Sequence, residues 1–369
     1  MEKGKLNAPA SDPRNSPLKE GRLPFLDGLR GLAAVWVIAD HSLYFTNSDI
    51  KFVNRGDIAV DLFMIMSGFL MAYHYYSRKD KEPWGEPRTW FKFYVRRSFR
   101  IAPLYYVLLA VFMLLGPMTD QWRNEIARHY AFVPKDSVRY LDHSFQNILM
   151  HVSFLFGMFK DYVTRTTMPD WSISLEMQFY FAFPFLMLIF RRYYFVIAIV
   201  VLYAVSYKIN AFLYHDGYQK PSVLPMSLHF FMMGMLLAFF SRFRADRLKA
   251  ATALVLAFGL AWLTQERFVV ALVLLITLLL NPNSIGRPVR CVAHMLGSRF
   301  STWLADMSYS AYLLHLGVMI PITYLCSHWD AYHQMPGCLR FLMVFVLTMI
   351  ATYSLSSVLF EYIEKNGIL

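Results

Sequence analysis

Long apolar runs dominate this sequence and constrain its fold more than any other feature. A helix that crosses a bilayer needs about 20 predominantly apolar residues. Ten runs approach that length, at 29–46, 58–77, 99–117, 171–190, 193–213, 223–241, 248–264, 268–281, 303–327 and 339–360. With 57% hydrophobic and only 17% charged residues, the chain is predicted to be an all-α, polytopic transmembrane helical bundle with about ten spanning helices.

Basic residues cluster between these runs, and their placement predicts the orientation of the chain. Short loops rich in lysine and arginine stay in the cytoplasm, which assigns 78–98, 242–249 and 287–299 to that side. Counting crossings then puts 118–170 outside and both termini inside, in the cell inner (plasma) membrane. The run 145–159 is therefore expected to be a re-entrant or interfacial helix rather than a crossing.

This topology accounts for the formal net charge of +11, so we expect no nucleic-acid partner. Residues 1–23 are hydrophilic, which predicts a disordered cytoplasmic tail and no cleavable signal peptide. Residues 24–364 are expected to form one transmembrane domain. The sequence shows no metal-ligand spacing and no nucleotide-binding or hydrolase motif. Cys326 and Cys338 flank one short loop and are interpreted as two free, membrane-buried thiols rather than a pair.

Two ionisable residues, Arg30 and His41, stand out in the first apolar run. They are eleven positions apart, which on a helix returns to within about 20° of the same face and about 16 Å further along. Both are expected to look into one groove, Arg30 at the cytoplasmic edge and His41 near mid-depth, where an ionisable group is costly. His41 could take a proton from a hydroxyl that attacks a thioester, or it could bond a neighbouring carbonyl as a packing residue.

Further candidates surround this pair. Asp61, at the outer end of the second run, could fix the tautomer of His41 or cap its own helix. Four arginines gather at cytoplasmic helix ends, either as a phosphate-binding cluster or as ordinary anchors at the membrane surface. They are Arg30, Arg96, Arg97 and Arg100, of which Arg30, Arg97 and Arg100 are the candidates for binding the donor. Gly68, beside Ser67, is interpreted as a site of close helix packing.

Three residues are candidates for binding the acceptor substrate. Trp171 suits the outer membrane interface. Glu176 lies about one to two turns deeper and is expected to face the cavity, where it binds a polar substrate or an arginine; the alternative is a protonated glutamate bonded to a neighbouring helix. His315, near mid-depth in the ninth run, could handle protons or orient the substrate, and it could equally serve packing.

These residues alone also fit a membrane transporter or flippase of a polar or lipid-linked substrate, because buried charges mark substrate pathways as well. Such a protein favours helices interrupted by glycine or proline in two related halves, and the sequence shows no such halves.

Taken together, the motifs resemble the acyltransferase 3 family of integral-membrane acyltransferases. Arg30 and His41 match an arginine-x10-histidine signature. The other matches are Asp61 ahead of S-G-F at 67–69, R-x-x-R-I-x-P at 97–103, W-S-x-x-x-E-x-x-F-Y at 171–180 and S-Y-x-x-Y-L-x-H at 308–315. The resemblance covers nearly the whole chain, and no single motif would be specific alone.

The resemblance implies transfer of an acyl group, usually acetyl, from cytoplasmic acyl-CoA to a hydroxyl of a glycan or lipid-linked acceptor. It implies that His41 is the catalytic residue and that the arginines hold CoA, which is a donor substrate and not a bound cofactor. Some members carry a fused extracytoplasmic esterase-type domain; here a second transfer step would need a separate extracytoplasmic transferase. The expected partners are acyl-CoA, a glycan or lipid-linked glycan, and membrane lipid.

Overall fold

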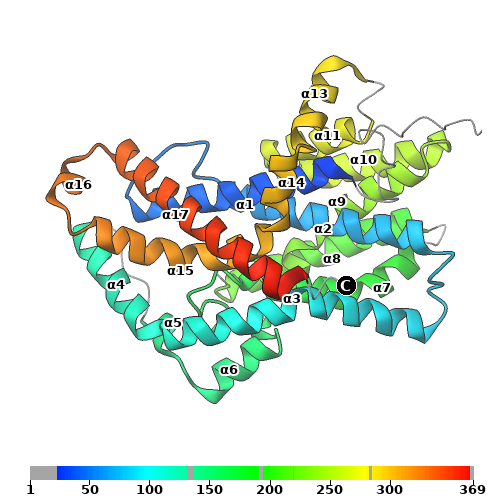
Figure 1. Ribbon diagram of the computed structural model, residues 1–369. Coiled ribbons are helices and arrows are strands. Elements are labelled where there is room, and N and C mark those ends of the chain that lie inside the picture. The colour runs from blue at the N-terminus through cyan, green and yellow to red at the C-terminus, as the bar shows by residue number, and fades with distance from the viewer. Residues whose placement is uncertain (1–22, 131–136, 191–193, 219, 282–284, 366–369) are drawn as a thin grey trace, which may run out of the picture.

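The computed structural model describes residues 23–130, 137–190, 194–218, 220–281 and 285–365. Within these ranges every regular element is a helix. The predicted tail, residues 1–23, lies outside the described residues apart from Leu23. Figure 1 shows the long helices packed into one bundle, from which α13 projects.

The longer helices are α1 (Pro24–Phe45), α2 (Gly56–Arg78), α3 (Pro87–Leu114), α4 (Gly116–His129), α7 (Trp171–Phe190), α8 (Phe195–His215), α9 (Leu224–Arg242), α10 (Arg247–Leu263), α11 (Arg267–Leu279), α13 (Arg287–Leu296), α15 (Ser308–Cys326) and α17 (Gly337–Leu359). The shorter ones are α5 (Val138–Leu141), α6 (Phe145–Val152), a 3-10 turn (Phe156–Met158), α14 (Arg299–Asp306), α16 (Asp330–Gln334) and a π-helical turn (Phe360–Glu364) that continues α17.

Seven of the described helices are long and apolar enough to cross a bilayer: α2, α3, α7, α8, α9, α15 and α17 with its final turn. α1 is equally long, but it carries three charged residues, Asp27, Arg30 and Asp40. α10 and α11 have only 17 and 13 residues, fewer than a perpendicular crossing needs. Within the described residues each predicted apolar run is helical over most of its length, and the chain is a multi-pass helical membrane protein.

Several boundaries differ from the prediction. α3 begins at Pro87, so its first turns carry basic residues that the sequence placed in a loop. The predicted run 303–327 is broken at Met307, between α14 and α15. There the Ala305 carbonyl accepts hydrogen bonds from the side chains of Arg30 and Ser308, which compete with the backbone bond of a continuous helix.

The segment 145–159 does not cross the membrane. It contains only the eight-residue α6 and a three-residue 3-10 turn, and eight helical residues span about 12 Å. The prediction of a non-spanning segment is therefore confirmed.

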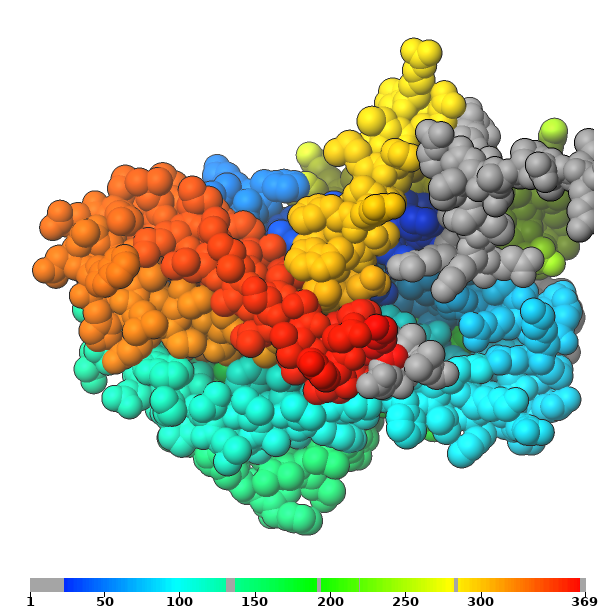
Figure 2. Space-filling view, viewed as in Figure 1, coloured from blue at the N-terminus to red at the C-terminus, as the bar shows by residue number. Residues whose placement is uncertain are grey.

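α1 lies at the junction of two buried apolar clusters. Val37 packs in the larger cluster with residues of α2, α3, α7 and α9. Ile38 and Phe45 pack in a second cluster with residues of α4, α15 and α17. Figure 2 shows α17 and α3 covering one face of this arrangement. Because α1 contacts both clusters, a polar residue on α1 is placed where several helices meet.

α2 and α9 approach each other closely through two glycines. A methyl group at Gly68 would lie 2.1 Å from the Phe231 carbonyl oxygen, and one at Gly234 would lie 1.9 Å from that of Ile65. No side chain fits at these distances, so the packing role predicted for Gly68 is confirmed.

Candidate active site

His41 and His315 face one another where α1 packs against α15. Nε2 of His315 lies 3.2 Å from Nδ1 of His41, and the ring centroids are 5.0 Å apart. His315 is fully buried, whereas His41 is partly exposed. Nδ1 of His315 also lies 2.7 Å from the Tyr312 carbonyl oxygen, and Nδ1 of His41 lies 3.0 Å from that of Val37.

These contacts assign the protons of the two neutral rings. A carbonyl oxygen only accepts hydrogen bonds, so both Nδ1 atoms carry hydrogen. Nε2 of His315 then has a lone pair that accepts from the Nδ1–H of His41. Nε2 of His41 is left unprotonated, which is the form that a general base requires.

His41 lines a cavity of about 80 Å³, here called the His41 pocket. This volume is well below the 300–1,000 Å³ that is usual for ligand pockets, so in this conformation the pocket admits only part of an acceptor. Its wall includes His41 and Tyr44 of α1, Arg123 of α4, Arg139 of α5, Trp171 of α7 and Lys220 from the loop before α9.

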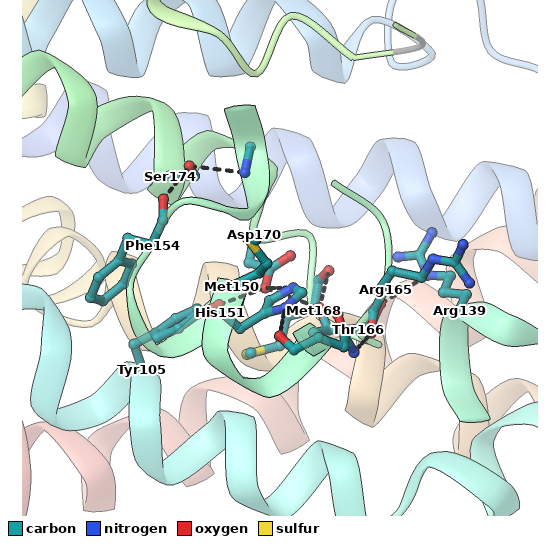
Figure 3. Close-up of polar contacts among 12 residues, drawn as sticks. Tyr105, Arg139, Met150, His151, Phe154, Arg165, Thr166, Met168, Asp170 and Ser174 are labelled. Atoms are coloured by element: carbon teal, nitrogen blue, oxygen red, sulfur yellow. Dashed lines mark hydrogen bonds and ion pairs between the residues drawn. The ribbon is translucent and has the colours of Figure 1, made fainter. Parts of the chain in front are cut away.

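A buried polar network holds the segment before α7 against this pocket (Figure 3). Asp170, 1% exposed, accepts hydrogen bonds from the hydroxyls of Tyr105 (2.9 Å) and Thr166 (3.0 Å). Nε2 of His151 lies 3.8 Å from the same carboxylate, and Arg139 donates to the Thr166 carbonyl at 2.9 Å. Burial raises the pKa of Asp170, because a carboxylate is poorly solvated there.

The same segment is tied to the histidine pair through Tyr312. Its hydroxyl donates to the Pro169 carbonyl (2.8 Å) and lies 2.8 Å from Oγ of Ser172. The Tyr312 carbonyl is the acceptor that fixes His315. The pocket wall and the histidine pair therefore share one support.

Arg30, Arg97 and Arg100 lie close enough for their charges to interact, since the charge of Arg100 acts on both of the other two. Arg30 donates to Oγ of Ser308 (3.1 Å) and to the Ala305 carbonyl (3.0 Å). The guanidinium of Arg97 lies 5.6 Å from the Tyr180 ring centroid. Three cations thus gather near one end of α1, as predicted. Arg96, predicted in the same cluster, instead pairs with Glu82 through two contacts of 2.7 Å.

Glu176 belongs with these arginines and not with Trp171. It accepts hydrogen bonds from Ser67 (3.1 Å) and from the Tyr180 hydroxyl, and its charge acts on Arg30 and Arg97. The sequence predicted Trp171 and Glu176 at one acceptor site. Side chains five residues apart on a helix point about 140° away from each other. Trp171 and Glu176 therefore lie at different sites.

The structure does not bring Asp61 to His41. The charged groups that act on Asp61 are Asp57, Glu266 and Arg55, and no hydrogen-bond partner of Asp61 occurs in the part of the chain that the structure describes. His315 occupies the position expected for Asp61. Asp61 does not cap α2 either, because the N-cap of that helix is Arg55.

Arg30 and His41 both contact the α14–α15 segment, in agreement with their predicted common face. That face is packed against α15 and is not an open groove. None of Arg30, Arg97 and Arg100 lines the His41 pocket. A second cavity, of about 780 Å³, lies near the ends of α2, α7 and α9, and its wall includes Trp84 and Arg242. The three arginines do not line this cavity either.

The sequence did not reveal Arg123, Arg139 and Lys220 as parts of the pocket. Arg139 lies 16 residues after Arg123, and Lys220 lies 81 residues after Arg139. None of the three belongs to a recognisable motif. Basic residues on segments predicted to be external were the only available signal, because the positive-inside rule disfavours them there.

Fold and site together define an integral-membrane protein with a histidine pair at a polar pocket inside a helical bundle. A family model described as an acyltransferase domain matches residues 23–360. The chain therefore belongs to the acyltransferase 3 family and is a membrane acyltransferase.

Several named proteins are similar to this chain. A Komagataeibacter xylinus protein described as a membrane-bound transacylase, BcsY, is 26% identical over 93% of this chain and 82% of its own length. Peptidoglycan O-acetyltransferase OatA of Listeria monocytogenes is 26% identical over 46% of this chain, but the match covers only 25% of OatA. Acyltransferase MdmB of Streptomyces mycarofaciens is 29% identical, over 46% of this chain and 40% of MdmB. No solved structure matches the chain.

Proposed function

We propose that this acyltransferase moves an acyl group, in the simplest case acetyl, from cytoplasmic acyl-CoA to a hydroxyl of a cell-surface or lipid-linked glycan. Family membership and the names of the relatives support O-acyl transfer, and one relative is named for peptidoglycan. The observation that carries the proposal is the His315–His41 contact, which leaves Nε2 of His41 unprotonated beside a pocket.

In this mechanism His41 is the general base and the acceptor hydroxyl lies against its Nε2. As the hydroxyl oxygen attacks the thioester carbonyl, its proton moves to His41. The carbon–sulfur bond breaks, the CoA sulfur leaves as a thiolate, and His41 returns the proton to that sulfur. An oxygen ester replaces the thioester with no net change in protons.

His315 is assigned a positioning role in place of the substrate-binding role expected from the sequence. Its Nε2 accepts the Nδ1–H bond of His41, and this bond strengthens when His41 becomes an imidazolium. A neutral imidazole thereby does the work that a carboxylate does in a catalytic triad.

For the donor, we assign the CoA phosphates to Arg30, Arg97 and Arg100, at the end of the bundle that the positive-inside rule places in the cytoplasm. This orientation puts both chain termini in the cytoplasm and the His41 pocket toward the outside of the inner membrane. Neither described cavity includes the arginines. We therefore propose that α15 moves away from the α1 face between Arg30 and His41, about 16 Å apart along the helix, when the donor binds.

The decisive test is His41→Ala, assayed with radiolabelled acetyl-CoA in membranes and by mass spectrometry of surface glycans. Loss of a general base should lower the rate at least about 100-fold. His294→Ala, at an exposed position of α13, is the matched control and should retain wild-type activity. Full transfer by a folded His41→Ala protein would refute the assignment of the base.

A further inference from the structure

The wall of the His41 pocket carries three cationic side chains, contributed by separate segments. Arg123 comes from α4, Arg139 from α5 and Lys220 from the loop before α9. No aspartate or glutamate is among the described residues that line the cavity. Arg139 and Lys220 both act electrostatically on His41, so positive potential is concentrated at the proposed base.

Arg123 is the most deeply buried of the three. It is 1% exposed, donates to the Tyr44 hydroxyl at 3.0 Å and lies over the Phe45 ring at 4.7 Å. The hydroxyl and the aromatic face help to hold the guanidinium in place at the wall of the pocket.

Neutral groups also position the other two cations. Arg139 donates to the Thr166 carbonyl at 2.9 Å. Nζ of Lys220 lies 5.9 Å from the Trp171 ring centroid. Burial and the positive charge of Arg139 lower the pKa of Lys220, which means that the pocket holds like charges in a poorly solvated place.

Three carboxylates act on these cations from positions outside the cavity lining. Asp40 and Asp57 act on Lys220, and Asp170 acts on Arg139. Asp40 packs beside Gly56 at the start of α2, and Asp170 accepts two hydroxyl hydrogen bonds. None of these three carboxylates lines the pocket. An anion that enters the pocket therefore contacts cationic side chains and no carboxylate.

We propose that the acceptor carries an anionic group, a carboxylate or a phosphate, next to the hydroxyl that is acylated, and that Arg139 and Lys220 bind this group. The inference rests on the proposed function and names the class of its acceptor: an acidic or phosphate-bearing sugar. An anion between the two cations offsets their repulsion and forms charge-assisted hydrogen bonds, which are about twice as strong as neutral ones.

A competing role for the same cations is to stabilise the oxyanion that forms as the thioester is attacked. The two roles predict different behaviour. Oxyanion stabilisation acts in the transition state and raises kcat, so its loss would lower kcat for every acceptor, charged or neutral. Binding of the acceptor's own charge acts before the reaction and discriminates charged from neutral ligands.

The test measures ligand-induced thermal stabilisation of the full-length protein in detergent at constant ionic strength. The probes are glucose, glucuronate and glucose 1-phosphate, which share a ring but differ in charge. We expect at least one charged sugar to bind about tenfold or more tightly than glucose, equivalent to about 1.4 kcal/mol. Preference for glucuronate identifies a carboxylate acceptor, and preference for glucose 1-phosphate identifies a phosphate-bearing one.

Variants at position 220 link the preference to the pocket. Lys220→Gln should remove the roughly tenfold preference, and Lys220→Arg, which retains the charge, should preserve it. Lys51→Gln, at an exposed position in the loop between α1 and α2, controls for general loss of positive charge and should match the wild type. Equal binding of all three sugars, or a preference that survives in Lys220→Gln, would overturn the inference.

Acetyl transfer to the same sugars, measured in parallel, separates the two proposals. Anion preference without transfer to any acceptor would count against the proposed function and leave the anion site standing. Transfer to glucose as efficient as transfer to the charged sugars would overturn the anionic acceptor and leave the transferase proposal standing.

Discussion

At the scale of single residues, position decides chemistry more than residue type does. The chain has 11 histidines, yet the His41–His315 pair is distinguished by a ring-to-ring hydrogen bond beside a cavity. Nδ1 of His315 is held by the Tyr312 carbonyl, so its other nitrogen only accepts. A buried histidine fixed in this way orients a neighbouring base.

Substitution of His315 tests this orienting role. His315→Leu should lower kcat by about 10- to 100-fold with little change in the KM of the acceptor. The Nδ1–H of His41 would keep only the Val37 carbonyl and lose the ring nitrogen that helps to orient it. His315→Gln, whose side-chain oxygen can accept the same bond, should retain more activity. Steady-state kinetics of both variants checks this; equal loss in both would indicate a packing role instead.

Arg97 tests the donor site at the same scale. Arg97→Gln should weaken acetyl-CoA binding by about tenfold, because one charge-assisted contact to phosphate is lost. The measurement is the rise in Tm on adding acetyl-CoA to the full-length protein in detergent. Lys92→Gln, on the same helix but exposed, is the control and should respond as the wild type does. Equal stabilisation of Arg97→Gln and the control would remove Arg97 from the donor site.

At the scale of elements, close packing between helices fixes which residues meet. α2 is held against α9 at Gly68 and Gly234, where the backbones nearly touch. This contact holds α2 in a fixed position relative to α9. Ser67, next to Gly68, is then in position to donate to Glu176 on α7.

Gly68→Ala tests this contact. The added methyl group would lie 2.1 Å from a backbone oxygen, so the helices must separate, at a cost of about 1–3 kcal/mol or more of unfolding free energy. Thermal unfolding in detergent measures the loss. Gly259→Ala on α10, where an added Cβ meets nothing within 4 Å, should be neutral or stabilising by less than about 1 kcal/mol. Equal stability of the two variants would contradict the packing argument.

At the scale of the whole molecule, the two ends of the bundle carry different chemistry. The arginine cluster lies near the start of α1, and the His41 pocket lies toward its end. The structure shows three free cysteines. Cys326 is buried, as expected, whereas Cys338, which was expected to be buried too, is exposed, as is Cys291. Cys291 lies on α13, which packs near the start of α1. Cys338 follows Gly337, whose carbonyl accepts a hydrogen bond from Ser48, just beyond the end of α1.

The two exposed cysteines therefore report the orientation of the natural protein. A membrane-impermeant maleimide should label Cys338 in intact spheroplasts and Cys291 only after permeabilisation, because we place the arginine end in the cytoplasm. Cys338→Ser and Cys291→Ser identify the labelled site. The reverse pattern would invert the proposed orientation and with it the side from which acyl-CoA binds.

The sequence by itself determined the features that depend on neighbours along the chain. Apolar runs of membrane-spanning length predicted the helices. The fixed rotation per residue in a helix placed Arg30 and His41 on one face, and both side chains do contact α15. The same local rule could have separated Trp171 from Glu176, because five residues do not return to one face.

Only the tertiary structure decided which helices became neighbours. It paired His41 with His315 and left Asp61 beside Asp57 and Glu266, and it brought Arg139 and Lys220 to one pocket. Apolarity drives a helix into the membrane but does not select its partner there, because lipid and other helices are similarly apolar. Shape complementarity at close contacts such as Gly68 makes that choice, and it is a property of pairs of distant residues.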